Sequence, residues 1–168
     1  MSENAFPVSP APSEESVPND MRPDVILERA RLRAKKQNLA YAGAVTPAEA
    51  WELVKEDRAI IVDVRTQEEY KFVGHVPDSL LIPWMCGTSM TKNPGFVSET
   101  EKQLSKEAII LLLCRSGKRS AGAAEALTAA GFTNVFNITE GFEGKLNDRM
   151  QRNHVNGWRF RHLPWLQE

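Results

Sequence analysis

One short segment of this 168-residue chain combines a nucleophile with a cluster of cations. Cys114 follows a run of aliphatic residues, and six small or polar residues come directly after it: Arg115, Ser116, Gly117, Lys118, Arg119 and Ser120. Gly117 allows the backbone to curl, so that several amide N–H groups point inward and form an anion-binding concavity. Inward amides and nearby cations favour the thiolate form of a cysteine, which is its nucleophilic form. The segment therefore predicts a reactive Cys114 in an anion-binding loop.

The residues on either side predict the elements that position this loop. Residues 108–113 read AIILLL, a short aliphatic run typical of a strand buried on both faces. An alanine-rich helix is expected from Ser120, with Gly131 just beyond its end. Cys114 is thus expected at the turn from a buried strand into a helix, where the helix dipole adds positive charge.

The rest of the chain alternates between strand and helix patterns. Further strands are expected at residues 44–46, 59–64, 79–83 and 135–138, and helices at residues 48–56, 66–72 and 98–106. Thr66 and Ser98 are expected N-caps, each with a glutamate three residues later. The alternation predicts an α/β fold with an open five-stranded parallel sheet and helices on both faces. Ligands of such sheets bind beyond the carboxyl ends of the strands, which is where Cys114 is expected.

Charge is segregated in the part of the chain that precedes this sheet, although the whole chain has a net charge of only −1. Residues 1–24 hold five prolines and a net charge of −4, and they are expected to form a disordered acidic tail. Residues 25–39 predict a basic amphipathic helix with Asp24 as N-cap and Leu32 on its apolar stripe. Its basic face is interpreted as solvated, with a partner or nucleic-acid contact as the less favoured alternative. Residues 40–168 are expected to form the α/β domain.

The composition favours a cytoplasmic protein without a membrane or nucleic-acid partner. No run approaches the ~18 to 20 apolar residues of a membrane-spanning helix, and the N-terminus lacks the pattern of a secretory signal. Two cysteines, Cys86 and Cys114, are too few for a disulfide framework or a four-cysteine zinc site, so no metal site is predicted. Cys86 is interpreted as a partly buried, inert thiol, with a resolving role toward Cys114 as the alternative.

The loop and several other segments resemble the single-domain rhodaneses, a family of thiosulfate and related sulfurtransferases. The similar segments cover about residues 44–165 in the family's order: Ile61-Val-Asp63-Val-Arg65 with Glu68, Glu69 and Tyr70; Gly74-His75-Val76-Pro77-Asp78-Ser79; Cys114 to Ser120; Gly131-Phe132; Glu140-Gly141-Phe142-Glu143-Gly144; and Gly157-Trp158 with Leu163-Pro164-Trp165. The resemblance implies a two-step transfer through a Cys114 persulfide, without a metal or organic cofactor. The donor would be a small anion such as thiosulfate. The acceptor would be cyanide or a thiol, including that of a thioredoxin-like or sulfur-carrier protein.

The resemblance also implies roles for individual side chains. The substrate-binding residues would be Arg115, Ser116, Gly117, Lys118 and Arg119, whose amides cradle the transferred sulfur and whose cations attract a dianionic donor.

Supporting roles fall to Asp63, Arg65 and Ser120. Asp63 is expected to accept hydrogen bonds from the loop amides, and Arg65 to pair with an acidic residue such as Glu69. His75 is expected to support the fold, because a cysteine that is already a thiolate needs no general base.

Two other classes of function remain open. Cell-cycle dual-specificity phosphatases and some arsenate reductases use a related Cys-x5-Arg loop, but Cys114 to Arg119 is Cys-x4-Arg, which is too short for a tetrahedral phosphate. A rhodanese-like binding, regulatory or sulfur-carrier module without turnover of its own is the other alternative. Modules that have lost activity usually lack the cysteine, which this chain has.

Overall fold

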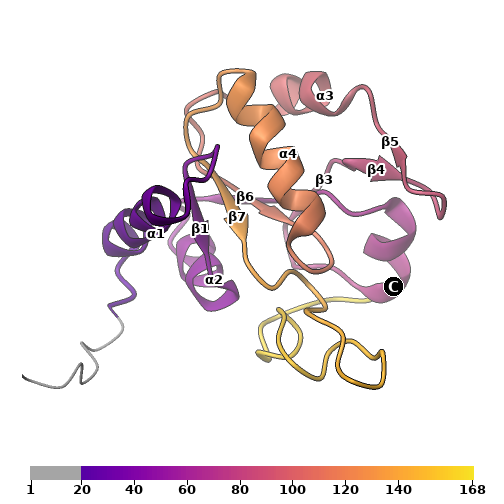
Figure 1. Ribbon diagram of the computed structural model, residues 1–168. Coiled ribbons are helices and arrows are strands. Elements are labelled where there is room, and N and C mark those ends of the chain that lie inside the picture. The colour runs from indigo at the N-terminus through magenta and orange to yellow at the C-terminus, as the bar shows by residue number, and fades with distance from the viewer. Residues whose placement is uncertain (1–19) are drawn as a thin grey trace, which may run out of the picture.

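Five parallel strands form the centre of the protein, in the order β1, β7, β6, β2, β3 (Figure 1). The computed structural model describes residues 20–168, so most of the tail expected at residues 1–24 lies outside the described residues. The strands are β1 Gly43–Val45, β2 Ile60–Asp63, β3 Leu80–Leu81, β6 Ile110–Leu113 and β7 Val135–Ile138. All neighbouring strands pair in parallel. The predicted five-stranded parallel sheet is confirmed, and each strand overlaps a predicted strand segment.

Helices cover both faces of this sheet, as predicted. The described residues form four α-helices and one π-helical segment: α1 Pro23–Gln37, α2 Pro47–Lys55, η1 Glu69–Val73, α3 Phe96–Gln103 and α4 Lys118–Ala129. Leu111 and Leu113 of β6 join the core that α1 and α2 cover, whereas Ile110 and Leu112 join the core under α3 and α4. Since successive side chains of a strand point to opposite faces, this one strand contributes to both cores, and all four side chains are buried.

Two capping predictions are confirmed. The Glu69 amide donates to Thr66 Oγ1 at 3.2 Å, and the Thr66 amide donates to Glu69 Oε1 at 3.3 Å, which makes a capping box. Gly131 follows the end of α4 with a φ of 100°, a left-handed conformation that glycine adopts without strain. Both devices depend on residues close together in the sequence.

Helix α1 begins earlier than predicted. Its N-cap is Arg22 rather than Asp24, and Pro23 occupies the start of the helix, where its fixed φ is favourable. Asp24 lies in the first turn, where its charge interacts favourably with the helix dipole. The boundaries predicted at residues 24 and 25 are therefore wrong by two residues.

Helices α3 and α4 also begin earlier than predicted. The N-cap of α3 is Gly95 rather than Ser98, because the Gly95 amide donates to Asn93 Oδ1 at 3.0 Å and Phe96 is already buried. Helix α4 begins at Lys118 with Gly117 as N-cap, two residues before the predicted start. The helix N-terminus is consequently closer to Cys114 than the sequence suggested.

The buried face of α1 also differs from the prediction. Its buried residues are Ile26, Leu27, Ala30 and Ala34, whereas Leu32 is 57% exposed. Small residues allow α1 to approach β1 closely: a Cβ on Gly43 would lie 2.5 Å from the carbonyl oxygen of Ala30.

Two cations of α1 make ion pairs with α2. Arg33 Nη1 contacts Glu49 Oε1 at 2.6 Å, and Arg29 Nε lies 3.5 Å from Glu49 Oε2. Burial alone would raise the pKa of Glu49, but hydrogen bonds from Arg33 and the Thr46 amide outweigh it, so the pKa is lowered. Part of the predicted basic face is therefore bound to α2 rather than solvated.

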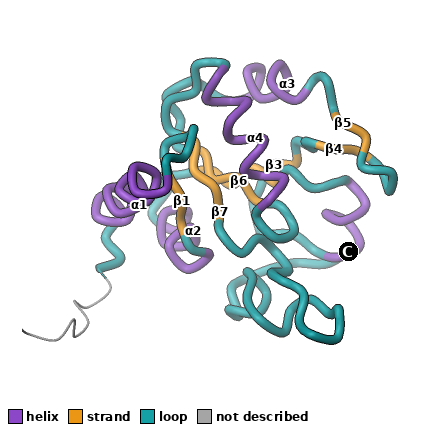
Figure 2. Tube along the Cα trace, viewed as in Figure 1, coloured by secondary structure: helices purple, strands orange, loops and turns teal. Residues whose placement is uncertain are grey.

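Two further features lie outside the sheet and its helices. A small antiparallel pair, β4 Met85–Cys86 and β5 Thr91–Lys92, was not predicted (Figure 2). Cys86 is exposed there, which corrects its predicted partial burial.

Residues 139–168 are mostly loop and gather at the end of the molecule where β7 ends (Figure 2). Among the described residues, no helix is both long enough and apolar enough to cross a membrane.

Candidate active site

Cys114 lies at the carboxyl end of the central strand β6, as the sequence predicts. Strands β2 and β7 flank β6, and α4 begins four residues after the cysteine. The cysteine is only 1% exposed. A reactive sulfur in this position would be reached only by a slender substrate.

The loop directs a backbone N–H group at the sulfur. Gly117 has a φ of 101° and donates its amide hydrogen to Cys114 Sγ at 3.0 Å. Ser120 Oγ lies 3.1 Å from the same sulfur. The Gly117 amide is a donor that can stabilise negative charge on the sulfur, whereas the Ser120 hydroxyl donates its one hydrogen to Asn137 Oδ1. Gly117 and Ser120, both predicted site residues, are thus brought into direct contact with Cys114.

Asn137 on β7 makes hydrogen bonds to the loop that the sequence did not predict. Its Oδ1 lies 2.5 Å from Ser120 Oγ, and its Nδ2 donates to the Gly117 carbonyl at 3.1 Å. Asn137 is 7% exposed and Ser120 is fully buried. The available signal was a polar residue in the otherwise apolar strand sequence VFNI. Because buried polar groups are nearly always paired, that residue could have been expected to have a partner.

Asp63 and Arg65 form a buried ion pair with each other. Arg65 Nη2 lies 2.7 Å from Asp63 Oδ2, Arg65 Nε lies 3.0 Å from Asp63 Oδ1, and both side chains are 0% exposed. Arg65 also donates to the Gly74 carbonyl at 2.6 Å and lies 4.3 Å from the centre of the Phe142 ring. Arg65 thus pairs with an acidic residue, as expected, but that residue is Asp63 and not Glu69. Asp63 accepts hydrogen bonds from the Arg65 amide and side chain, and not from the amides of residues 115–119 as expected. The planar guanidinium of Arg65 can donate to both carboxylate oxygens of Asp63 at once, which makes it the stronger partner.

Glu69 instead binds Arg119. The two side chains make a bidentate pair, with distances of 2.7 Å and 2.9 Å, and Arg119 Nη1 also approaches Met90 Sδ at 3.8 Å. Burial would raise the pKa of Glu69, but the hydrogen bond and charge of Arg119 lower it more, so the net shift is downward. The pKa of Arg119 is raised: burial lowers it, and the contact with Glu69 outweighs that effect. One of the three predicted substrate-binding cations is thus already neutralised.

The other two cations of the loop differ in exposure. Lys118 is exposed, and Arg115 is half-buried. The Nε atom of Arg115 is buried and has no hydrogen-bond partner in the structure. Ser116 is half-buried between Arg115 and Gly117.

The segment after β7 supports the loop from behind. The Phe142 amide donates to the Cys114 carbonyl at 2.8 Å, and the Glu143 and Gly144 amides donate to the Arg115 carbonyl at 2.9 Å and 3.1 Å. This approach requires a glycine at position 141, because a Cβ there would lie 2.5 Å from Ser116 N, and the φ of Gly141 is 70°. The glycine-rich stretch therefore allows the two backbones to lie in direct contact.

His75 contacts the fold rather than the loop. Its ring stacks on Tyr70 with a centroid distance of 4.1 Å, its Nδ1 lies 3.2 Å from the Tyr70 carbonyl, and its backbone pairs with Leu166. These contacts agree with the expected supporting role.

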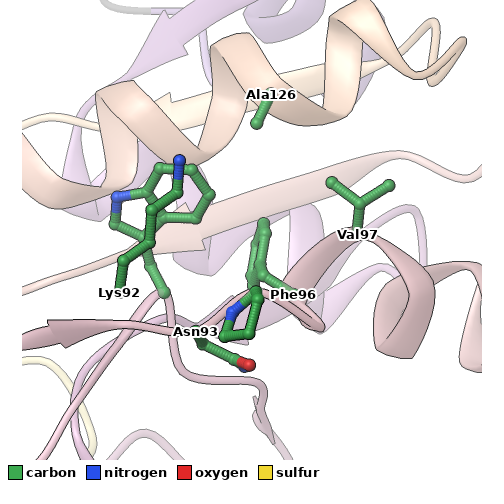
Figure 3. A pocket seen from close by; sticks show the side chains of 7 residues that line it. Lys92, Asn93, Phe96, Val97 and Ala126 are labelled. Atoms are coloured by element: carbon green, nitrogen blue, oxygen red, sulfur yellow. The ribbon is translucent and has the colours of Figure 1, made fainter.

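A separate hollow lies between α4, α3 and β5. It has a volume of about 400 Å³, and seven residues line it: Trp84, Lys92, Asn93, Pro94, Phe96, Val97 and Ala126 (Figure 3). None of them belongs to the Cys114 loop. The hollow is therefore distinct from the site around Cys114.

Comparison with known proteins points to one family. The sequence profile of the rhodanese-like domain matches residues 46–147. A protein of Rickettsia rickettsii with no assigned function is 38% identical over 118 residues, covering 67% of this chain and 87% of the relative. The thiosulfate sulfurtransferase GlpE of Coxiella burnetii is 33% identical over 99 residues, covering 59% of this chain and 82% of the relative.

A solved structure gives the same result. The crystal structure of Rv0390 from M. tuberculosis is 41% identical and covers 76% of this chain and 99% of its own, with a TM-score of 0.68. The profile match includes β2, β6, α4 and the Cys114 loop, so it spans the elements that build the site. With the parallel sheet and the cysteine at its carboxyl edge, these matches establish that the chain belongs to the rhodanese-like family.

Proposed function

We propose that this protein is a sulfurtransferase that holds the transferred sulfur as a persulfide on Cys114. The contact that supports this most directly is the hydrogen bond from the Gly117 amide to Cys114 Sγ at 3.0 Å. An inward amide stabilises negative charge on sulfur, both on the attacking thiolate and when the same thiolate is later displaced. Relatives named as thiosulfate sulfurtransferases, in Coxiella burnetii and Arabidopsis thaliana, support the same class of reaction.

The proposed reaction has two balanced steps. In the first, the Cys114 thiolate attacks the outer sulfur of thiosulfate, a new S–S bond forms, and sulfite leaves with the electron pair of the broken bond. In the second, a thiolate or cyanide attacks the terminal sulfur of the persulfide, and Cys114 leaves as a thiolate. Only the cysteine is covalently modified, so the scheme uses no metal or organic cofactor.

The shape and charge of the site favour a small anionic donor. Cys114 is 1% exposed, which selects a slender sulfane sulfur over a bulky group. Arg115 and Lys118 add positive charge that attracts an anion to the loop. Ser120, held by Asn137, keeps the loop closed around the sulfur. The acceptor is proposed to be a thiol, free or on a thioredoxin-like or sulfur-carrier protein.

Mass spectrometry of the full chain tests the proposal. After incubation with thiosulfate, the Cys114 peptide should gain about 32 Da, the mass of one sulfur atom, and should lose it on addition of cyanide. Cys114→Ala should abolish the labelling, whereas the matched variant Cys86→Ala should retain it.

Two results would contradict the proposal. If thiosulfate, 3-mercaptopyruvate and glutathione persulfide all leave wild-type Cys114 unlabelled, the domain is a binding module and not a transferase. If turnover of an aryl phosphate exceeds turnover of thiosulfate, the phosphatase alternative replaces it.

A further inference from the structure

The loop holds less free positive charge than its sequence suggests. Arg119 is bound at two points by Glu69, so this pair contributes little net charge to the site. Arg115 and Lys118 remain, and Lys118 is exposed to solvent, which screens its charge. A dianionic donor would therefore benefit from a further cation close to Arg115.

Arg152 in the C-terminal segment lies within two hydrogen bonds of the loop. Its Nη1 donates to the Gly144 carbonyl at 2.8 Å, and the Gly144 amide donates to the Arg115 carbonyl at 3.1 Å. A single residue thus separates the Arg152 guanidinium from the backbone of the loop. A Cβ on Gly144 would collide with the Asn156 carbonyl, so this close packing requires glycine there.

Cations and carboxylates both act on Arg152, and the largest single charge effect on it comes from Arg115. Its pKa is lowered, first by burial and then by the charge of Arg115, with a smaller contribution from Arg119, while Glu143 and Glu69 oppose the shift. Arg115 also has a buried Nε without a hydrogen-bond partner. Cations that repel one another, one of them with an unused donor, are stabilised when an anion binds between them.

We propose that Arg152 and Arg115 together form the site that binds the oxyanion end of the sulfur donor. This inference rests on the proposed sulfurtransferase function and names the residues that recognise the donor. Because sulfite leaves with an additional electron pair, a second cation at this end stabilises the leaving group as the S–S bond breaks. In this proposal, Arg152 binds the donor in the role that the sequence analysis expected for Arg119.

The charge at the site can be measured without sulfur transfer. Iodoacetate and iodoacetamide alkylate a thiolate by the same displacement of iodide, but only iodoacetate is an anion. All variants are made in a Cys86→Ser background so that Cys114 is the reactive thiol. The readout is the ratio of the iodoacetate rate to the iodoacetamide rate for the full chain.

Arg152→Gln is expected to lower this ratio about 3- to 10-fold at low salt, the size expected for one charge several ångströms away. Arg152→Lys should restore much of it. Arg149→Gln is the matched control, because Arg149 is exposed in the same segment and its removal changes the net charge equally. We expect Arg149→Gln to leave the ratio unchanged, and about 0.5 M salt to weaken the effect of Arg152→Gln.

The same variants give the steady-state constants with thiosulfate. Arg152→Gln should raise KM about 5- to 20-fold at low salt, with a smaller change at high salt. Two results would overturn the inference. One is an unchanged alkylation ratio in Arg152→Gln, which indicates a purely structural role if both reagents react more slowly. The other is an equal effect of Arg149→Gln. If the ratio falls but thiosulfate never labels wild-type Cys114, the anion site stands and the proposed function fails.

Discussion

The loop of residues 114–119 and the C-terminal segment of residues 139–168 meet at the same cysteine but are built differently. The loop is fixed at both ends by regular elements, β6 and α4. The C-terminal segment is mostly loop and is fixed by backbone contacts to Cys114 and Arg115 and by the buried side chains of Phe142 and Trp158. Elements next to Cys114 in the sequence thus position the cysteine. The backbone that packs against the loop comes from a segment that is held by contacts with residues far away in the sequence.

The largest expected effect comes from removing the buried pair that connects the end of β2 with the C-terminal segment. Arg65 binds Asp63 at the end of β2 and lies over the ring of Phe142 in the C-terminal segment. Asp63→Ala leaves a buried guanidinium without its counter-ion, which should lower the free energy of unfolding by about 3 to 5 kcal/mol. Urea denaturation measures the change.

A matched control uses an exposed ion pair. Asp24 pairs with Arg58 at 2.8 Å, and Asp24 is 84% exposed. Asp24→Ala should cost less than about 1 kcal/mol. Similar losses in the two variants would show that burial does not make the Asp63 pair more important for stability than an exposed pair.

The contact between the two regions is tested at Gly141. Gly141→Ala forces a methyl group to within 2.5 Å of Ser116 N and strains a positive φ, so it should cost about 2 to 4 kcal/mol and reduce sulfur transfer strongly. Gly87 has a similar φ of 65° but nothing within 4 Å of the added methyl group. Gly87→Ala should therefore show only the backbone strain, about 1 to 2 kcal/mol, with normal transfer. Equal losses of transfer would remove the close contact as the cause.

Asn137 tests how far the loop itself depends on the sheet below it. Asn137→Ala removes the partner of Ser120 and of the Gly117 carbonyl, and should cost about 1 to 3 kcal/mol. We expect the rate of persulfide formation to fall about 10-fold, as judged by the mass assay. Asn134→Ala, at a half-buried position just before β7 and at the opposite end of that strand from the loop, should leave the rate unchanged. A wild-type rate in Asn137→Ala would mean that β6 and α4 alone position the loop.

The smallest effect is expected from the Glu69–Arg119 pair and depends on pH. The pKa of Glu69 in the folded protein lies below its usual value of 4.5. A carboxyl group with a lowered folded-state pKa adds stability that is fully present above the unfolded value and is lost as the pH falls through the folded value. Glu69→Gln should therefore cost about 1 kcal/mol at pH 7, and the difference from wild type should disappear in acid.

A surface pair provides the comparison for this titration. Glu101 contacts Lys106 at 3.2 Å, and both side chains are more than one-third exposed. Glu101→Gln should change stability little at any pH. A Glu69→Gln effect that stays constant from pH 7 to about pH 3 would contradict the assigned role of the carboxylate.

The sequence was sufficient wherever neighbouring residues determine the structure. Buried strands at residues 59–64 and 108–113 follow from aliphatic runs, and the Thr66 capping box follows from a four-residue pattern. The placement of Cys114 at a strand-to-helix turn follows in the same way. Resemblance to a family extended this reading to the Asp63 and Arg65 segment and to the glycine-rich stretch after β7.

The sequence was insufficient where the partner lies far along the chain. Nothing near Glu69 shows that its cation is Arg119, 50 residues away, rather than Arg65. The buried face of α1 was misplaced because its packing depends on Gly43 and β1, not on its own periodicity. Arg152 binds Gly144, and the backbone around Gly144 is held by hydrogen bonds to the distant residues Cys114 and Arg115.

The near-complete burial of Cys114 has a consequence for how the sulfur is protected and delivered. With 1% of its surface exposed, Cys114 is shielded from bulky oxidants and from unrelated disulfides. In the proposed persulfide, the outer sulfur extends about 2 Å beyond Sγ, one S–S bond length. An acceptor would then need to reach only this outer sulfur, and not the buried Sγ of Cys114 itself.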